Sequence, residues 1–287
     1  MTYQMRQRID YFKWSLTRLG DTDVSCPACG SPATRVVGRK YLVTALRECQ
    51  PCRLRFRVPK EEPEQAGAFY QNTYQEGMTT RMPSDDELAD LLKAGFAGTV
   101  KDFTPYIEVC RALGMKRGAR LLDFGCSWGY GSWQFRQAGF DVWSSEISVP
   151  RREFARTKLQ CRLLEDLGSV AGSIDCFFSA HVIEHLPNPG IIFRIARAAL
   201  TDTGVMVTFC PNGDPESSWS NHYSDLWGRK HPLVITPEFI NQNCRKYGFT
   251  ARMYSEPYNL EAIARGDDGG ALSGEELCIV MRRDGRG

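Results

Sequence analysis

The feature that most constrains the fold of this chain is an alternation of short apolar segments with helical segments from about residue 100 onward. Apolar runs typical of strands cover residues 120–124, 140–144, 173–179, 204–209, 249–255 and 276–282. Segments with helical character lie between them, at residues 103–116, 132–138, 191–200 and 237–247. Strands that alternate with crossover helices form a doubly wound sheet, which binds ligands at the carboxyl ends of its strands. The sequence therefore predicts the α/β class, with a mostly parallel sheet over residues 100–287.

The turn after the first of these strands carries residues that suit a ligand. The strand ends in Asp123 and continues into Gly125-Cys-Ser-Trp-Gly129-Tyr-Gly131. The glycine spacing matches neither the dinucleotide motif G-x-G-x-x-G nor the nucleoside-triphosphate motif G-x-x-x-x-G-K-[ST]. Glycines here would let a ligand lie against the backbone, and Asp123 would suit a positive charge on that ligand. Glu146 follows 23 positions after Asp123, at the end of the next strand, where a carboxylate can accept both hydroxyls of a ribose.

Two C-x2-C pairs near the N-terminus predict a structural zinc site. Cys26-Pro-Ala-Cys29 and Cys49-Gln-Pro-Cys52 are separated by 19 residues, a spacing typical of four-cysteine zinc modules. Four thiolates complete a tetrahedron and leave no open position for catalysis. The short strands of a zinc ribbon are expected around a turn at Gly38, at residues 34–37, 41–44 and 54–58. Disulfides or redox pairs are the alternative, which a reducing cytosol and the lack of a thioredoxin-like context disfavour.

Periodicity and composition organise the rest of the N-terminal third. Residues 4–19 are expected to form a short amphipathic helix with the apolar positions Ile9, Phe12, Leu16 and Leu19. Residues 60–65 have the composition of a linker, and Ser84 with Glu87 predicts a capped helix near residues 85–94. The aromatic residues of segment 69–74 would either cover a cleft or pack between domains. The predicted organisation is a helix and zinc ribbon at 1–60, a linker and lid-like helix at 61–99, and the α/β domain at 100–287.

Charge and cysteine usage add further limits. The seven cysteines outside the two pairs are predicted to be small core residues: Cys110, Cys126, Cys161, Cys176, Cys210, Cys244 and Cys278. Residues 1–60 carry 12 Lys and Arg against 4 Asp and Glu, a balance of +8, and the remainder carries 24 against 30, a balance of −6. The basic segment would either face an anionic partner or pack against the acidic part of the chain. Without a membrane-spanning run or a secretory signal, we expect a cytoplasmic protein that does not enter a membrane.

Two segments resemble a known enzyme family. Residues 121–129, LLDFGCSWG, resemble the first motif of class I S-adenosylmethionine-dependent methyltransferases, and residues 173–189, SIDCFFSAHVIEHLPNP, resemble the fourth. Residues 231–240 are similar to the late helix of the methyltransferases in this family that act on small molecules. Residues 246–249 are similar to the Gly-Phe segment with which that helix ends. The resemblance covers residues 100–283 and implies a Rossmann-like methyltransferase domain with S-adenosyl-L-methionine as cofactor. Ser127 stands where the family has glycine, which requires its φ to stay negative.

The resemblance also implies which residues contact the cofactor. The backbone of the bend would flank its methionine part at Gly125, Cys126 and Gly129, with Asp123 near the ammonium group. Glu146 would hold the ribose hydroxyls. Three further cofactor contacts are implied beyond the bend. Asp166, which follows the third strand, would lie near the adenine amino group and is preferred over Glu165. Ser179 and His181 would lie beside the methyl group.

The segment His181-Val-Ile-Glu-His185 has a second interpretation. It matches H-x-x-E-H, the inverted zincin motif of metallopeptidases. Pro187 and Pro189 shorten the segment and a strand precedes it, so a zinc peptidase is disfavoured. Within the methyltransferase interpretation, Glu184 and His185 are structural, and His181 at the strand end is the preferred general base.

A long loop from residue 211 to residue 232 supplies other candidates. His222 and Tyr223 are the alternative bases, and Trp219 and Trp227 either line an acceptor pocket or anchor the loop. The leading function is methyl transfer to O or C of a small molecule, namely a sugar, a sugar nucleotide or a secondary metabolite. An anionic acceptor would suit the basic N-terminal segment.

Two alternatives to this function stay open. The zinc ribbon before a class I domain resembles bacterial sugar methyltransferases, although their long C-terminal half is missing. An RNA base methyltransferase whose ribbon binds RNA is the first alternative, and a non-catalytic zinc-ribbon scaffold is the second. The sequence does not indicate an oligomeric state.

Overall fold

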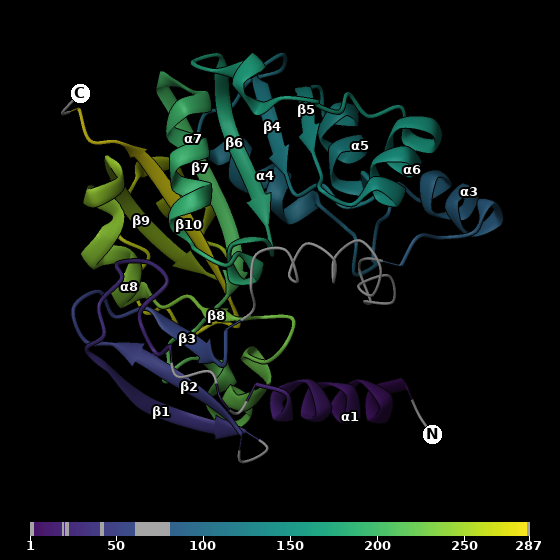
Figure 1. The fold of residues 1–287 in the computed structure, drawn as a ribbon. Helices are drawn as coiled ribbons and strands as arrows, with labels where there is room; N and C mark the ends of the chain where they lie inside the picture. The colour runs from purple at the N-terminus through teal and green to yellow at the C-terminus, as the bar shows by residue number, and fades with distance from the viewer. Residues whose placement is uncertain (1–2, 19, 21–22, 41–42, 61–80, 286–287) are drawn as a thin grey trace.

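The chain builds two sheets, and the computed structural model describes residues 3–18, 20, 23–40, 43–60 and 81–285. The larger sheet has the strand order β5-β4-β6-β7-β10-β9, and the smaller has the order β1-β2-β3-β8. In Figure 1 the smaller sheet and α1 lie below the larger sheet, with α7 in front of it. The aromatic segment 69–74, Leu19 and nearly all of the predicted linker lie outside the described residues.

The larger sheet confirms the predicted α/β class. Its strands are β4 (Arg120–Phe124), β5 (Asp141–Ser145), β6 (Ile174–Ala180), β7 (Leu200–Pro211), β9 (Phe249–Ser255) and β10 (Glu276–Arg283). β4 pairs in parallel with β5 and β6, and β6 pairs in parallel with β7. β10 runs antiparallel to β7 and β9. The third strand that the family resemblance implied is reduced, in the described residues, to one parallel bridge between Ser144 and Leu163.

Helices precede and connect these strands, and some of them begin at a residue whose side chain caps the helix. They are α3 (Asp85–Lys93), α4 (Thr104–Ala112), α5 (Tyr130–Gln137), α6 (Val149–Leu159), α7 (Gly190–Ala199), α8 (Pro237–Asn243) and α9 (Leu260–Arg265). At α3 the Ser84 hydroxyl accepts from the Glu87 amide, and the Glu87 carboxylate accepts from the Ser84 amide. This capping box confirms the predicted start of α3.

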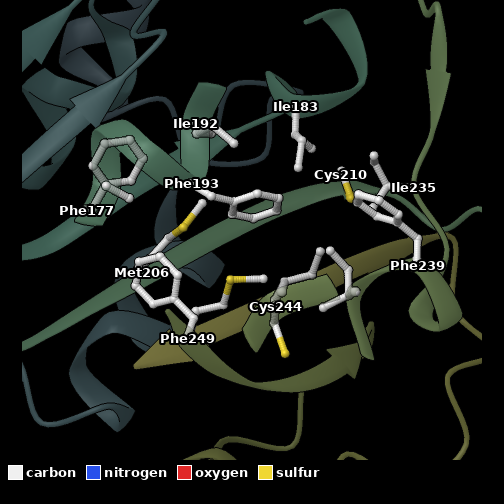
Figure 2. Close-up of a cluster of buried hydrophobic side chains, with 14 of the residues drawn as sticks. Phe177, Ile183, Ile192, Phe193, Met206, Cys210, Ile235, Phe239, Cys244 and Phe249 are labelled. Carbon is white, nitrogen blue, oxygen red and sulfur yellow. The ribbon is translucent and has the colours of Figure 1, made fainter. Parts of the chain in front are cut away.

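The hydrophobic core lies on both faces of the larger sheet. Successive side chains of a strand point to opposite faces, so Phe177 and Phe178 belong to different clusters. Phe177 packs in the cluster that Figure 2 draws, with Phe193 of α7 and Phe249 of β9. Phe178 packs with Phe135 of α5 on the other side. The seven single cysteines are all buried, which confirms their prediction as core residues.

The smaller sheet has the three strands expected of a ribbon, with different bounds. They are β1 (Thr34–Lys40), β2 (Thr44–Cys49) and β3 (Arg55–Val58). The predicted turn at Gly38 is wrong, because β1 continues through this residue and the register shifts between Val36 and Gly38 as in a β-bulge. The predicted second strand at residues 41–44 begins instead at Thr44.

Helix α1 (Tyr3–Leu16) forms as predicted, but it does not bury the predicted face. Phe12 and Leu16 are each 40% exposed, whereas Tyr11 and Ser15 are buried. The Ser15 hydroxyl lies 3.2 Å from the Thr44 hydroxyl of β2, so α1 docks on the ribbon partly through polar side chains. The apolar spacing therefore predicted the helix correctly and its buried face incorrectly.

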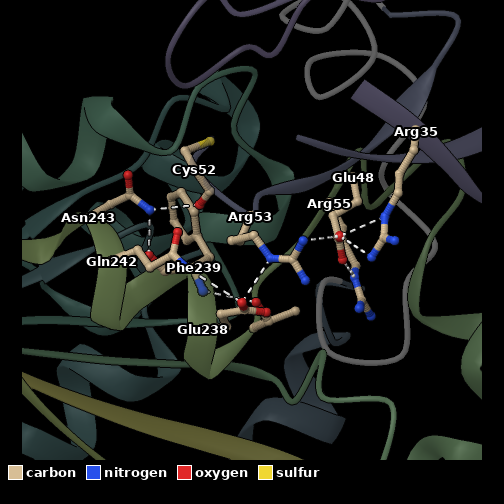
Figure 3. A network of polar contacts seen from close by, with 10 residues as sticks. Arg35, Glu48, Cys52, Arg53, Arg55, Glu238, Phe239, Gln242 and Asn243 are labelled. Carbon is tan, nitrogen blue, oxygen red and sulfur yellow. Dashed lines mark hydrogen bonds and ion pairs between the residues drawn. The ribbon is translucent and has the colours of Figure 1, made fainter. Parts of the chain in front are cut away.

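The ribbon is continuous with the α/β domain. The short strand β8 (Leu233–Val234) pairs with β3 and completes the smaller sheet. Cys26, Cys49 and Cys52 belong to the same buried cluster as Phe239 of α8. The Asn243 amide donates to the Cys52 carbonyl at 2.8 Å, as Figure 3 shows. The cysteine-bearing ribbon and the large sheet thus share one core.

Many of the basic side chains of the N-terminal segment are engaged within the molecule. The buried Glu48 carboxylate receives Arg35, Arg53 and Arg55 (Figure 3). Arg53 also pairs with Glu238 of α8 at 2.8 Å, which joins the ribbon to the acidic part of the chain. The Arg53–Glu238 pair supports the second interpretation of the charge asymmetry, in which the two parts pack together.

Candidate active site at the carboxyl edge of the large sheet

The bend after β4 is anchored by backbone hydrogen bonds to β5. The amides of Gly125 and Cys126 both donate to the Ser145 carbonyl, at 2.7 and 3.0 Å. Gly125 has φ +82° and Gly129 has φ +92°, the left-handed region in which glycine is favoured. Ser127 has φ +52°, so the expectation of a negative φ is wrong. Ser127 therefore has the left-handed backbone conformation that favours glycine, the residue that the family has at this position.

Close packing is a second reason for glycine in this bend. A Cβ added at Gly125 would lie 2.5 Å from Val182, and one at Gly129 would lie 2.7 Å from the Cys161 sulfur. A Cβ at Gly131 would lie 2.2 Å from the Phe103 ring. Neighbouring side chains therefore require glycine at these three positions.

Glu146 faces the bend, as the sequence predicted. Its side chain is buried, with Oε2 accepting from the Ser127 amide at 2.9 Å and Oε1 accepting from the Ser148 amide at 2.8 Å. Burial raises the pKa of Glu146, and the amides of Ser148 and Ser127 oppose that rise. A carboxylate has about four lone-pair positions, which is more than these two backbone amides occupy.

Asp123 lies on the neighbouring strand beneath the same bend. Its Oδ2 accepts from the Ser132 hydroxyl at 2.6 Å, and Ser132 in turn receives the Ser144 hydroxyl. Burial, assisted by the nearby charge of Glu146, raises the pKa of Asp123 to about 7. Such a carboxyl group gains from a cation placed beside it, because the cation stabilises its charged form.

An unsatisfied hydroxyl in the bend points to a missing polar partner. Ser127 is buried, and among the described residues its Oγ has no hydrogen-bond partner. Buried polar groups are rarely left without one. Next to Glu146, by contrast, Ile147 is 63% exposed and presents an apolar surface. The bend therefore combines two acidic groups, an orphaned hydroxyl and an apolar neighbour, a set that suits a cationic nucleoside.

The other cofactor residues predicted from the family occupy different surroundings. Asp166 is exposed and its Oδ1 accepts from the Gly168 amide, so it caps the short helix at Leu167–Val170. Ser179 is fully buried and its hydroxyl lies 2.7 Å from Thr208 within the sheet. Glu165 pairs with Arg152 and Arg156 at the surface. A contact of Asp166 or Ser179 with the cofactor stays a prediction.

His181 follows β6 and lies between two carboxylates. Its Nε2 is 2.6 Å from Glu276 Oε2, and its Nδ1 is 3.4 Å from Glu184 Oε1. Burial lowers the pKa of His181, but these two carboxylates outweigh it and raise the pKa above its usual range. The side chain is 48% exposed, so it can meet a second molecule.

The alternative bases lie in other surroundings. His222 is exposed within the 3-10 segment Ser218–Leu226. The Tyr223 hydroxyl accepts from Arg55 at 2.6 Å and donates to the Gly213 carbonyl at 2.9 Å, so it is engaged at the ribbon. Trp227 is buried beside Leu46 of β2, in agreement with an anchoring role for this loop.

Glu276 is a site residue that the sequence analysis missed. Besides His181, its carboxylate receives the hydroxyls of Tyr106 and Tyr258. Glu276 begins β10, and because β10 is antiparallel its first residue lies at the carboxyl edge of the parallel strands. The strand direction, which the apolar pattern does not contain, was the missing signal.

The four paired cysteines converge as a zinc site requires. Cys26 Sγ lies 3.4 Å from Cys52 Sγ, and Cys29 Sγ lies 3.5 Å from Cys49 Sγ. All four sulfurs lie within 4.8 Å of one another. Sulfurs around one zinc ion at about 2.3 Å are separated by about 3.8 Å, so the four residues fit this ion.

None of the helices in the described part of the chain has the length and apolar character needed to cross a membrane.

A family profile described as a methyltransferase domain matches residues 101–253. The ubiquinone biosynthesis O-methyltransferase of Bordetella avium (strain 197N) is 33% identical over 115 residues, which are 36% of this chain and 47% of that protein. The chain thus spans about half the length of the curated relative that it matches.

One solved structure shows a similar fold, and a second matches this chain with a lower TM-score. Phosphoethanolamine N-methyltransferase 2 of Haemonchus contortus, in complex with S-adenosyl-L-methionine, superposes with a TM-score of 0.50 and 15% identity, over 80% of this chain and 61% of that one. A TehB-like SAM-dependent methyltransferase of Corynebacterium glutamicum ATCC 13032 gives a TM-score of 0.47 and 17% identity, over 78% of this chain and 100% of that one.

Proposed function

Because this chain belongs to the methyltransferase domain family, we propose that it transfers a methyl group from S-adenosyl-L-methionine to O or C of a small molecule. Sugars, sugar nucleotides and secondary metabolites are the acceptor classes. One observation carries the proposal: Asp123 and Glu146 end two neighbouring parallel strands on either side of one tight bend, and Glu146 is hydrogen-bonded to that bend.

The residues present fit the cofactor. Asp123 would face the ammonium group of the methionine part, and the remaining lone pairs of Glu146 would accept the ribose hydroxyls. The orphaned Ser127 hydroxyl would gain a polar partner, and the exposed Ile147 would pack on the flat base. The bound cofactor supplies an electrophilic methyl group on a sulfonium. The chain's task is to align this group with the acceptor and to exclude water.

His181 with Glu276 is the proposed proton-handling pair. The half-exposed imidazole has its Nε2 at 2.6 Å from Glu276 Oε2, and the carboxylate fixes the ring. The raised pKa of His181 favours the protonated ring at neutral pH, so His181 would receive an acceptor proton only after giving up its own. Tyr106 and Tyr258 donate to the same carboxylate and hold it in place. His222 and Tyr223 are weaker candidates for this role, given the surroundings described above.

The proposal includes one structural zinc ion held by Cys26, Cys29, Cys49 and Cys52. A closed set of four thiolates leaves no position for a substrate, so the ion would stabilise the ribbon and the core that it shares with α8. A zinc-ribbon RNA methyltransferase receives less support, because Arg35, Arg53 and Arg55 converge on Glu48. A non-catalytic scaffold would not require both acidic residues at the bend.

A methyl-transfer screen with labelled S-adenosyl-L-methionine tests the proposal. Purified protein is incubated with a panel of sugar nucleotides, with phenolic and hydroxylated metabolites, and with bulk RNA. We expect label in a small-molecule fraction and its loss in Glu146→Ala. Label in RNA alone would establish the alternative activity, and failure of the wild-type protein to bind the cofactor in calorimetry would leave only the scaffold.

A further inference from the structure

A second cluster of metal-binding side chains lies apart from the four cysteines. Glu184 and His185 are adjacent in the single 3-10 turn Ile183–His185, and His231 approaches them from the segment before β8. One ligand atom from each of the three residues lies within 4.8 Å of the other two. His185 Nε2 is 3.9 Å from Glu184 Oε1, and the two imidazole rings are 4.6 Å apart.

Backbone carbonyls fix the tautomers of both histidines. His185 Nδ1 lies 2.7 Å from the Lys230 carbonyl, and His231 Nδ1 lies 3.2 Å from the Leu226 carbonyl. A carbonyl oxygen only accepts, so Nδ1 carries the hydrogen in each ring and Nε2 carries the lone pair. Histidines that bind metals are held in this way, with the nitrogen that does not face the metal donating to a carbonyl or carboxylate.

Glu184 provides an independent indication of a missing cation. Its side chain is 3% exposed, and within the described part of the chain neither carboxylate oxygen has a hydrogen-bond partner. The 3.4 Å contact with His181 Nδ1 is an ion-pair contact and does not fill the other lone pairs. A buried carboxylate without hydrogen bonds is uncommon, and a coordinated cation would occupy the lone pairs that the ion pair with His181 leaves open.

We propose that Glu184, His185 and His231 bind a divalent transition-metal ion such as Zn²⁺, Co²⁺ or Mn²⁺. Two imidazoles and one carboxylate suit these ions and leave coordination positions for water or another oxygen ligand. Ligand atoms around such an ion lie about 3.0–3.4 Å apart, so small rotations of the side chains close the site. The inference does not depend on methyl transfer, because it concerns binding of the metal alone.

Metal titration of the full-length protein with its cysteine site filled by zinc tests this site. Mn²⁺ is the first probe, because it prefers nitrogen and oxygen ligands to thiolates. We expect one Mn²⁺ per chain in calorimetry and in electron paramagnetic resonance, in addition to the zinc. His231→Gln and Glu184→Gln should each weaken that binding at least tenfold, whereas His222→Gln, which changes an exposed histidine outside the cluster, should not.

Cobalt provides a second readout. Excess Co²⁺ added to the zinc-filled protein should give weak visible bands without thiolate charge-transfer absorption, and these bands should disappear in His231→Gln. If Glu184→Gln does not fold, circular dichroism will reveal it and His231→Gln decides. The site is ruled out if the wild-type protein binds no metal beyond the cysteines, or if folded His231→Gln binds Mn²⁺ as the wild type does. Either result leaves the proposed methyl transfer untouched.

Discussion

Glu146 Oε2 accepts a hydrogen bond from the Ser127 amide at 2.9 Å, which ties the acidic end of β5 to the bend after β4. Ser127 holds a left-handed conformation at this point, with φ +52°. The carboxylate therefore serves the shape of the bend and the proposed ribose contact at the same time.

Replacing Glu146 with glutamine should weaken S-adenosyl-L-methionine binding by roughly 10–100-fold, because hydrogen bonds to a charged group contribute about 1.5–3 kcal/mol. Isothermal titration calorimetry measures this change. Glu261→Gln, on the exposed face of α9, is the matched control and should bind as the wild type does. Equal binding by Glu146→Gln and the control would exclude the ribose contact.

Cofactor binding should release a proton from Asp123 at pH 6. The raised pKa of about 7 keeps this carboxyl group largely protonated there, and the incoming ammonium group favours its ionisation. Calorimetry in buffers of different ionisation enthalpy counts the protons. Release should vanish at pH 8.5, where Asp123 is already ionised, and in Asp123→Asn; release that persists in the variant would assign the proton to another group.

The same group should affect the stability of the ligand-free protein. Its pKa is higher in the folded than in the unfolded chain, so its contribution is fully present below about pH 4 and is lost as the pH rises through 7. Asp123→Asn should therefore gain stability relative to the wild type between pH 5 and pH 8, by roughly 1–3 kcal/mol. Denaturant unfolding at the two pH values measures it.

Cys49→Ser should destabilise the whole molecule and not the ribbon alone, because Cys49 shares a core with Phe239 of α8. Structural zinc contributes about 10–16 kcal/mol in small modules, so a loss of at least about 10 °C in melting temperature is expected. Cys244→Ala, which removes a thiol outside the four, is the control. Two separate melting transitions would show that the ribbon unfolds independently.

Gly131→Ala should destabilise the protein by about 1–3 kcal/mol, since the new methyl group would lie 2.2 Å from the Phe103 ring. Gly20→Ala is the matched control, because nothing lies within 4 Å of a Cβ at that position. Chemical denaturation compares the two variants. Equal stability would mean that Phe103 moves aside without cost.

Glu48→Gln should cost about 1–3 kcal/mol at pH 7, because it removes the charge on which Arg35, Arg53 and Arg55 converge. Burial raises the pKa of Glu48, but Arg35 and Arg55 outweigh it and lower the pKa below its usual value. The stabilisation by ionised Glu48 is therefore fully present at pH values above the usual pKa of a glutamate. It is lost as the pH falls through the lowered pKa of Glu48 in the folded protein. Denaturation at pH 7 and pH 3 should show the variant's deficit shrinking in acid.

Local sequence determined much of the fold and the core of the site. Asp123, the bend and Glu146 are each set by a short strand followed by a turn, so their meeting at one sheet edge was predictable. The four cysteines were predictable from spacing alone. The turn at Gly38 failed because the residues on both sides of the glycine continue as one strand, which a bulge permits.

Contacts between distant segments were not predictable. Ser15 is buried because it meets Thr44, and hydrophobic periodicity does not register a polar contact between a helix and a sheet. Ser127, which has a positive φ, donates a hydrogen bond to Glu146, a residue 19 positions further along the chain. His231 joins Glu184 only because the segment before β8 returns to the ribbon, and nothing in its neighbouring residues announces that return.

The pairing of β8 with β3 has a consequence for synthesis of the chain. Residues 59 to 232 leave the ribosome between the two strands, so the N-terminal sheet stays one strand short until most of the protein has been made. The four cysteines can bind zinc early in synthesis, but β8 and α8, which pack against the ribbon, are synthesised late. A nascent chain halted before Leu233 would expose the edge of β3, and that edge is where we expect molecular chaperones to bind.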